Sequence, residues 1–204
     1  MTPTTEAETE LPVRERARPM APEERRRALV QCVIPLLAEH GRDVSTRQIA
    51  EACGVAEGTV FRAFGDKESL IAAAVEAYFD PEPFRAALAA VDHALPPEEK
   101  IRQVFILLRE RFTGVMGFMS ALRMQGGPPP SIRRADSGWM AVLEALLEPD
   151  RAALAVPPRT IARYLRLLAL SSAIPHLHGD RGLEPDEIVH LIQHGVLLPD
   201  TEED

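Results

Sequence analysis

The chain has 204 residues, of which 46% are hydrophobic and only 5% aromatic, and its formal net charge is −8 at pH 7. Such a composition supplies a core but few of the β-branched and aromatic runs that favour sheets, so it favours packed helices. No apolar run is long enough to span a bilayer, and no charged-then-apolar leader opens the chain. We therefore expect a cytoplasmic protein that does not contact a membrane.

The net charge by itself argues against nucleic-acid binding, because affinity for DNA draws on lysine and arginine. The charges are unevenly distributed, however. Residues 23–67 carry seven basic and seven acidic side chains, whereas residues 68–204 carry 13 basic and 20 acidic ones, a net charge of −7. A neutral N-terminal segment on an acidic body is typical of a DNA-binding end, although an ordinary acidic globular protein has the same pattern.

The N-terminal region begins with a segment that lacks an apolar pattern. Residues 1–21 are rich in Thr, Pro, Glu and Arg, which predicts a disordered arm. A helix is predicted from Pro22 to His40, with Pro22 in its first turn, an interruption at Pro35 and an end at Gly41. Its apolar residues recur at three- and four-residue spacing and form one stripe.

The chain has two cysteines, Cys32 and Cys53, and both fall in helix-like patterns. We expect them to be reduced and buried, as cysteines of cytosolic proteins generally are. A redox-sensing role is the alternative.

Three further helices are predicted before residue 80. Ser45 has the position of an N-cap, with Gln48 completing a capping box for a short helix over residues 46–53. A second short helix covers residues 57–64, and Asp66 is the expected N-cap of a helix that continues to Phe79.

The remaining chain is helical by pattern, with Pro and Gly residues between the segments and no strand-like alternation. The helices are expected over residues 82–92, 97–117, 118–124, 132–147, 158–177 and 185–197, and the longest contains Phe105 and Phe112.

The spacing of small and apolar residues from Thr46 onward matches a helix-turn-helix. Gly54 falls at the turn, where a positive φ is wanted, and Ala50 falls where the two helices cross and only a small side chain fits. The positions that bury the core between the helices are occupied by Ile49, Cys53, Val55, Val60 and Ala63.

The second helix of such a motif enters the major groove and presents its N-terminal residues to the bases. Gly58 has no side chain, so the helix start can press against the sugar-phosphate backbone. Thr59 can contact a phosphate or a thymine methyl group, and Arg62 can reach a guanine or a phosphate.

Two phosphate clamps are predicted on either side of this helix. Lys67 opens the next helix, where backbone N–H groups also point outward. Thr46 and Arg47, at the start of the first short helix, form the matching clamp.

The run STRQIAEACGVAEGTVFRAFGDKESLI resembles the DNA-binding segment of TetR-family transcriptional regulators. The shared features are Thr-x-x-x-Ile-Ala, the Gly-Val turn, Gly-Thr at the start of the recognition helix, an aromatic residue at 61, Phe64, and Lys67 followed by an acidic residue and Leu70. The close resemblance covers about residues 26–79.

The resemblance implies an all-α fold with two domains. A three-helix DNA-binding domain is expected over residues 22–80, with its motif at about residues 45–64, and a helical effector-binding and dimerisation domain over residues 81–204. The implied function is that of a transcriptional regulator, in the first instance a repressor, which binds a palindromic operator in double-stranded DNA as a homodimer. A small-molecule effector would release it, although an activator or an effector-free variant remains open.

Three residues of the expected DNA-facing set depart from the family pattern. Ala56 stands where Ser is frequent, so the recognition helix lacks a side-chain N-cap, at a cost of about 1 kcal/mol. Glu57 stands where a basic residue is common and would repel phosphate. Phe61 stands where Tyr is common, so one hydroxyl is missing.

The C-terminal body offers a candidate effector pocket and a candidate dimer interface. Soft and bulky side chains make adaptable pocket walls, although the same residues also make ordinary core; the pocket is assigned to Phe105, Leu108, Phe112, Met116, Met119, Trp139 and Leu143, with Arg109, Arg123 or Glu144 as polar contacts. The resemblance implies that the last two long helices pair with their mates, through Ile161, Leu165, Leu168, Ser172, Ile188, Leu191, Ile192 and Gly195. These stripes could also face only their own core.

Other functions find little support in the sequence. The chain shows no nucleophilic triad, phosphate loop or paired acids, so an enzyme is not expected. His176 with His178 and His190 with His194 lack the further ligands of a metal site, and no metal or cofactor is expected. A helical adaptor that binds protein rather than DNA, or a degenerate enzyme, is the alternative.

Overall fold

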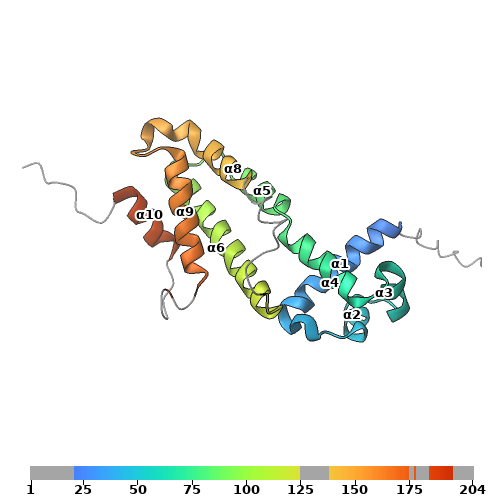
Figure 1. Cartoon of the computed structure of the whole chain (residues 1–204). Coiled ribbons are helices and arrows are strands. Elements are labelled where there is room, and N and C mark those ends of the chain that lie inside the picture. The colour runs from blue at the N-terminus through green and yellow to red at the C-terminus, as the bar shows by residue number, and fades with distance from the viewer. Residues whose placement is uncertain (1–20, 125–137, 175–176, 178–183, 195–204) are drawn as a thin grey trace, which may run out of the picture.

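The computed structural model describes residues 21–124, 138–174, 177 and 184–194, and its regular structure within them is helical. Helices α1 to α4 gather at one end of the molecule, α9 and α10 lie at the other end, and α6 runs between them (Figure 1). The elements are α1 (Pro22–His40), the 3₁₀ helix η1 (Gly41–Asp43), α2 (Thr46–Ala52), α3 (Glu57–Phe64), α4 (Lys67–Phe79), α5 (Glu82–Ala89), α6 (Pro97–Ala121), α8 (Gly138–Leu147), the 3₁₀ helix η2 (Glu148–Ala153), α9 (Pro158–Ser172) and α10 (Pro185–His194).

The N-terminal helices begin where their predicted caps lie. The Ser45 hydroxyl accepts the Gln48 amide N–H, and the Gln48 side chain accepts the Ser45 N–H at 2.8 Å, which completes the capping box of α2. The Asp66 carboxylate accepts the Ser69 N–H at 2.7 Å at the start of α4. These local hydrogen bonds satisfy backbone donors that a helix start leaves unpaired, and the predicted bounds of α1, α3 and the end of α4 are confirmed.

Some predicted segments extend past what the structure describes. The arm expected over residues 1–21 lies outside the described residues except for Ala21, and so do the start of the helix expected over 132–147 and the end of the one expected over 185–197. Helix α9 ends at Ser172, earlier than the predicted limit of 177.

One predicted helix break is absent. Residues 97–121 form one continuous helix, so the division expected between residues 117 and 118 is wrong. Gly117 costs such a helix about 1 kcal/mol, and burial of a phenylalanine side chain contributes more than that. Phe118 is 1% exposed, so its packing outweighs the cost of the glycine beside it.

A first hydrophobic core holds α1 to α4 together. It is formed by α1 residues such as Val33 and Leu37, by Ile49 and Val60 of the helix-turn-helix, and by the buried stripe of α4. Phe118 and Leu122, from the last turn of α6 and the residue after it, complete the same core. This core therefore extends beyond the domain limit expected at residue 80.

A second core lies among α5, α6, α8, α9 and α10. Phe105 and Leu108 of α6, Trp139 and Leu143 of α8, and Leu165 of α9 are all buried in it. The only buried charged side chain in the described part of the chain borders this core: the Lys100 ammonium of α6 pairs with Asp150 of η2 at 2.7 Å. Burial of a charge requires such a partner, so the pair fixes η2 against the start of α6.

The end of α4 packs against α6. The Tyr78 ring stacks on Phe118, with centroids 3.9 Å apart, and Phe79 packs edge-on against the same ring at 6.1 Å. The Arg111 guanidinium donates to the Tyr78 carbonyl oxygen at 3.0 Å. Burial raises the pKa of the Tyr78 hydroxyl, and the positive charge of Arg111 opposes that rise.

Gly41 brings α1 and α6 into close backbone contact. Its φ is +63°, and a Cβ atom there would lie 2.4 Å from the Ala121 carbonyl oxygen. Any other residue would both strain this backbone and collide with α6, so Gly41 is required for this approach of the two helices.

The two cysteines form a disulfide, which corrects the expectation that they are reduced and buried. Cys32 of α1 and Cys53 at the end of α2 are bonded, with Cα atoms 5.7 Å apart, and both residues are partly exposed. Their separation of 21 residues gives no local signal of this pairing. Only the packing of the helix-turn-helix against α1 brings them together.

We predict that Phe118→Ala lowers the free energy of unfolding by about 3–5 kcal/mol, because it removes a ring that fills the first core and stacks on Tyr78. Urea titration followed by circular dichroism measures this change. The matched control is Met116→Ala on the same helix, where the side chain is 38% exposed and the expected change is within about 0.5 kcal/mol. Equal losses from the two variants would contradict this role for Phe118.

Candidate nucleic-acid interface

The turn between α2 and α3 has the geometry that the spacing predicts. Gly54 has a φ of +63°, and the Val55 N–H donates to the Ala50 carbonyl oxygen at 2.9 Å. Ile49, Ala50 and Val60 are buried, while Cys53, Val55 and Ala63 pack partly buried against them. The left-handed conformation at Gly54 is available to glycine at no steric cost, which explains why glycine occupies this turn.

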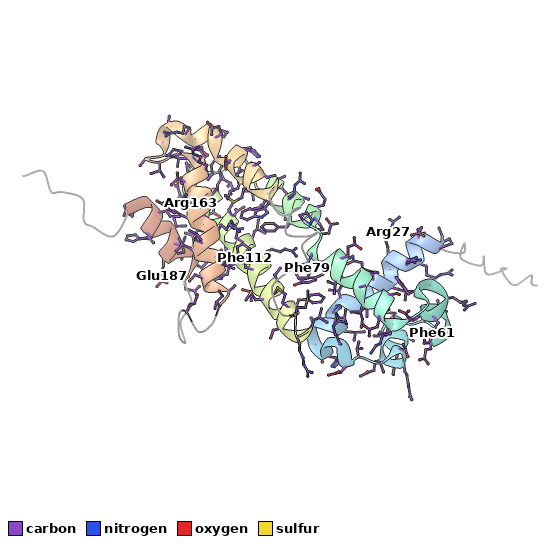
Figure 2. All side chains as sticks on the ribbon, viewed as in Figure 1. Arg27, Phe61, Phe79, Phe112, Arg163 and Glu187 are labelled. Carbon is purple, nitrogen blue, oxygen red and sulfur yellow. A yellow bond between two sulfur atoms is a disulfide. The ribbon has the colours of Figure 1, made fainter. Side chains whose placement is uncertain are left out.

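The outer face of α3 has open space at its start. A Cβ atom at Gly58 would meet no atom within 4 Å, and the φ of Gly58 is not positive. Neither the packing nor the backbone conformation within the chain therefore explains a glycine in this helix. Phe61 is 45% exposed and projects from the same helix at the end of the molecule (Figure 2).

Arg62 lies along α3 rather than pointing straight out from it. Its Nε donates to the Gly58 carbonyl oxygen at 3.2 Å, and its Nη2 lies 3.4 Å from the Thr59 hydroxyl. The side chain is exposed, and its guanidinium has further donors. These hydrogen bonds hold the charge over the start of the helix, next to the open space at Gly58.

Thr46 and Glu57 connect the starts of α2 and α3. The Thr46 hydroxyl donates to the Glu57 carboxylate. Because that donor is engaged within the protein, the predicted contact of Thr46 with a phosphate would have to replace it. Arg47, next along α2, is exposed. Ala56 makes no side-chain cap at the start of α3, as its residue type predicts.

The Lys67 side chain does not extend freely into solvent, as the predicted phosphate clamp would require. Its Nζ donates to the carbonyl oxygens of Arg42 at 3.1 Å and Val44 at 3.3 Å. An ammonium group has three donors, so one remains for an outside acceptor. Lys67 thus holds the segment between α1 and α2 in place, a role that residue spacing did not indicate.

A basic groove lies where the start of α1 approaches α3. The groove has a volume of about 250 Å³ and is lined in part by Arg25, Arg26, Thr59 and Arg62. The Arg26 guanidinium lies 4.8 Å from the centre of the Phe64 ring, which orients it beside α3. Arg25 and Arg26 lie outside the DNA-facing set predicted from the sequence, and the fold brings this turn of α1 next to α3.

Acidic groups are also fixed near this surface. Hydrogen bonds from the backbone and side chain of Ser69 hold the pKa of Asp66 below its usual value, so this carboxylate stays ionised. Glu68 pairs with Arg42 at 3.1 Å. The surface is therefore mixed in charge, with basic side chains on α1, η1, α2, α3 and the start of α4.

The residues assigned to an effector pocket are divided between different environments. Phe105, Leu108, Trp139 and Leu143 are buried in the second core, and Phe112 packs edge-on against Trp139 with ring centres 6.4 Å apart. Met116 is exposed, and Met119 packs against the first core. A large cavity in the described part of the chain is lined by other residues.

That cavity has a volume of about 800 Å³ and is bounded by the start of α6, the segment after η2, α9 and α10. Leu168, Leu191 and Ile192 of the predicted dimer interface line it, together with Tyr164 and Leu167, which are 46% and 55% exposed.

The other residues of the predicted dimer interface are more deeply buried or less fully described, although Ile161 also reaches the cavity. Ile161, Leu165 and Ile188 are buried in the second core. At these residues the apolar stripe of each helix faces its own chain, which is the alternative that the sequence left open. Ser172 is partly buried, and Gly195 lies outside the described residues.

Two further expectations concern membranes and metals. Among the described helices, none is long and apolar enough to cross a membrane. Within the same residues, no group of three or more His, Cys, Asp and Glu side chains is placed to hold a metal ion. His190 and His194 lie side by side on α10, with ring centres 4.8 Å apart, whereas His176 and His178 are outside the described residues.

The helix-turn-helix segment matches a known protein family. Residues 34–74 match the model of the bacterial regulatory proteins of the tetR family. This range contains α2, α3 and most of α4. No curated protein matches the chain.

Solved structures match over most of the chain. A TetR transcriptional regulator from Streptomyces coelicolor is 23% identical, with a TM-score of 0.53 over 86% of this chain and 99% of its own. A regulator of the TetR/AcrR family from Thermobifida fusca is 22% identical, with a TM-score of 0.53 over 85% and 98%. A putative transcriptional regulator from Saccharomonospora viridis, solved in complex with choline, is 17% identical, with a TM-score of 0.58 over 84% and 94%.

The helix-turn-helix geometry, the family match within it and the shared all-helical fold agree with the resemblance found in the sequence. Residues 34–74 thus carry a segment of the tetR-family type, and the whole chain shares its helical fold with TetR-family transcriptional regulators.

Proposed function

We propose that the protein is a repressor that binds a palindromic operator as a homodimer and is released by a small-molecule effector. The single observation that carries the DNA-binding part is the open start of α3, where Gly58 has no neighbour within 4 Å and Arg62 lies over the same turn. A surface that is left empty within the chain, beside basic side chains, suits the close approach of a sugar-phosphate backbone.

A second copy of the chain is the proposed occupant of the open cavity on α9 and α10. Tyr164 and Leu167 expose apolar area there that a monomer would leave in water. Arg163 on α9 and Glu187 on α10 lie at this end of the molecule (Figure 2). A two-fold axis would bring the basic face of α9 toward the acidic start of α10 of its mate.

The proposed route from effector to DNA runs through α6. Phe112 is partly buried in contact with Trp139, which makes it a candidate contact for an apolar or amphipathic effector. The preceding residue, Arg111, holds the Tyr78 carbonyl at the end of α4. A shift of α6 at Phe112 would therefore move α4 and, through the first core, the recognition helix. The choline complex of the S. viridis protein supports a small-molecule site in this fold.

We expect a selection from randomised duplex DNA to yield a palindromic site whose affinity falls as the salt concentration rises, since phosphate contacts release counterions. Arg62→Ala should weaken binding to that site by about 1–3 kcal/mol. The measurement is a fluorescence anisotropy titration at two salt concentrations.

Arg151→Ala is the matched control, because this exposed arginine lies on η2, far along the chain from α3, and should leave DNA affinity unchanged. A folded protein that enriches no site at low salt would overturn the proposal. A helical adaptor would give that result.

Leu167→Glu should convert the proposed dimer into a monomer, because it places a charge among the exposed apolar side chains of α9. Sedimentation equilibrium measures the state, and DNA affinity should fall with it, since each half-site would be bound separately. Met116→Glu, an exposed position on α6, is the control and should remain dimeric. A dimer that survives Leu167→Glu would place the interface elsewhere.

A screen for small molecules that release labelled operator should find an effector that weakens DNA binding about 5- to 150-fold. Arg111→Met should still bind that effector by calorimetry but release the operator less, because the contact between α6 and the end of α4 is lost. Unchanged release from Arg111→Met would exclude this route.

A further inference from the structure

We propose that the Cys32–Cys53 disulfide is a reversible thiol–disulfide switch that sets the affinity of the helix-turn-helix for DNA. The proposal rests on the DNA-binding function proposed above. It adds a second input, the thiol–disulfide balance of the surroundings, that acts on the DNA-binding domain itself rather than through the C-terminal helices.

The disulfide lies at a point where it constrains the DNA-facing elements. Cys32 lies within α1, and Cys53 is the C-cap residue of α2, immediately before the Gly54 turn. The ring that the disulfide closes contains Thr46 and Arg47, and α3 begins four residues after Cys53. The bond therefore joins the supporting helix to the hinge between the two helices that would contact DNA.

The two helices depend on such support. Helix α2 has seven residues and α3 has eight, and helices this short are not stable by themselves in water. Their orientation rests on contacts of Ile49 and Val60 with the α1 side of the first core. Covalent attachment at the turn removes independent motion of α2 and α3 relative to α1, so the oxidised protein is organised for DNA before it binds.

Neither cysteine is fully buried. Cys32 and Cys53 are both partly exposed, and their sequence neighbours Gln31, Ala52 and Gly54 are exposed. These two are the only cysteines of the chain, so no third thiol competes for either sulfur within one molecule. A small thiol or disulfide can therefore reach the bond without unfolding of the core.

The exchange needs only a low-molecular-weight disulfide such as glutathione disulfide. The thiolate of one cysteine attacks it, forms a mixed disulfide and releases one glutathione thiolate; the second cysteine thiolate then attacks the cysteine sulfur of the mixed disulfide and releases the other. The protein loses two electrons and two protons in total, and glutathione disulfide becomes two thiols. Excess glutathione runs the same steps in reverse.

The test equilibrates the full chain in mixtures of glutathione and glutathione disulfide. Free thiols are trapped with a maleimide and counted by mass spectrometry, and DNA affinity is measured by anisotropy in the same mixtures with the site found by selection. We expect the oxidised protein to bind DNA about tenfold more tightly than the reduced protein. This change lies within the usual range of coupling between two sites of a protein. Cys32→Ser and Cys53→Ser should bind like the reduced protein in every mixture.

Several outcomes would overturn the switch. The switch is rejected if the oxidised and reduced proteins bind DNA equally well, or if the reduced protein binds more tightly. It is also rejected if excess glutathione does not open the disulfide, or if the two thiols never pair. Because reduced and oxidised wild type are compared directly, a serine variant that fails to fold does not decide the result.

Hydrogen exchange distinguishes failure of the switch from failure of the proposed function. Without DNA, the amides of residues 46–64 should exchange more slowly in the oxidised protein, and equal exchange in both states would reject the constraint. If neither the oxidised nor the reduced protein binds a specific DNA site, the DNA-binding proposal and the switch both fail. If both forms bind the site with equal affinity although exchange is slower in the oxidised protein, only the switch is rejected.

Discussion

The packing of Phe118 against Tyr78 and Phe79 fixes the end of α6 in the core of α1 to α4. Helix α6 buries Phe105 and Leu108 in the C-terminal core and then inserts Phe118 into the core of α1 to α4. A long helix is stiff because every residue adds a backbone hydrogen bond, so a displacement at one end is carried to the other. The Arg111–Tyr78 hydrogen bond and the close contact at Gly41 also attach α6 to the N-terminal helices.

The DNA-facing surface is held by interactions that are largely polar and local. Lys67 ties down the segment between α1 and α2, Thr46 and Glu57 link the starts of α2 and α3, and the disulfide connects α1 to the turn. Each of these attaches a short helix at one of its ends, where unpaired backbone groups and hinge motion are concentrated. The orientation of α3 therefore depends on several small constraints as well as on the buried apolar residues beneath it.

Much of the DNA-binding part could be predicted from the sequence because its determinants are short-range. Caps at Ser45 and Asp66, glycine at a left-handed turn and apolar spacing each act within a few residues, and the bounds of α1 and α3 follow from them. The C-terminal part was less predictable because its arrangement depends on contacts between helices that are far apart in the sequence. Periodicity finds the apolar stripe of a helix but not whether that stripe faces its own chain or a second one, which is why Ile161 and Leu165 were assigned to an interface and lie in the core.

The sequence by itself determined the helical class, the position of the helix-turn-helix and its relationship to the TetR family, since these rest on local spacing and residue size. The tertiary structure decided what depends on residues far apart in the chain. It paired Cys32 with Cys53 and placed Arg26 beside α3. It also turned Lys67 toward the carbonyl oxygens of Arg42 and Val44, and it left Tyr164 and Leu167 of α9 exposed. Such contacts form only when helices pack, and no pattern along one helix specifies which neighbour it will meet.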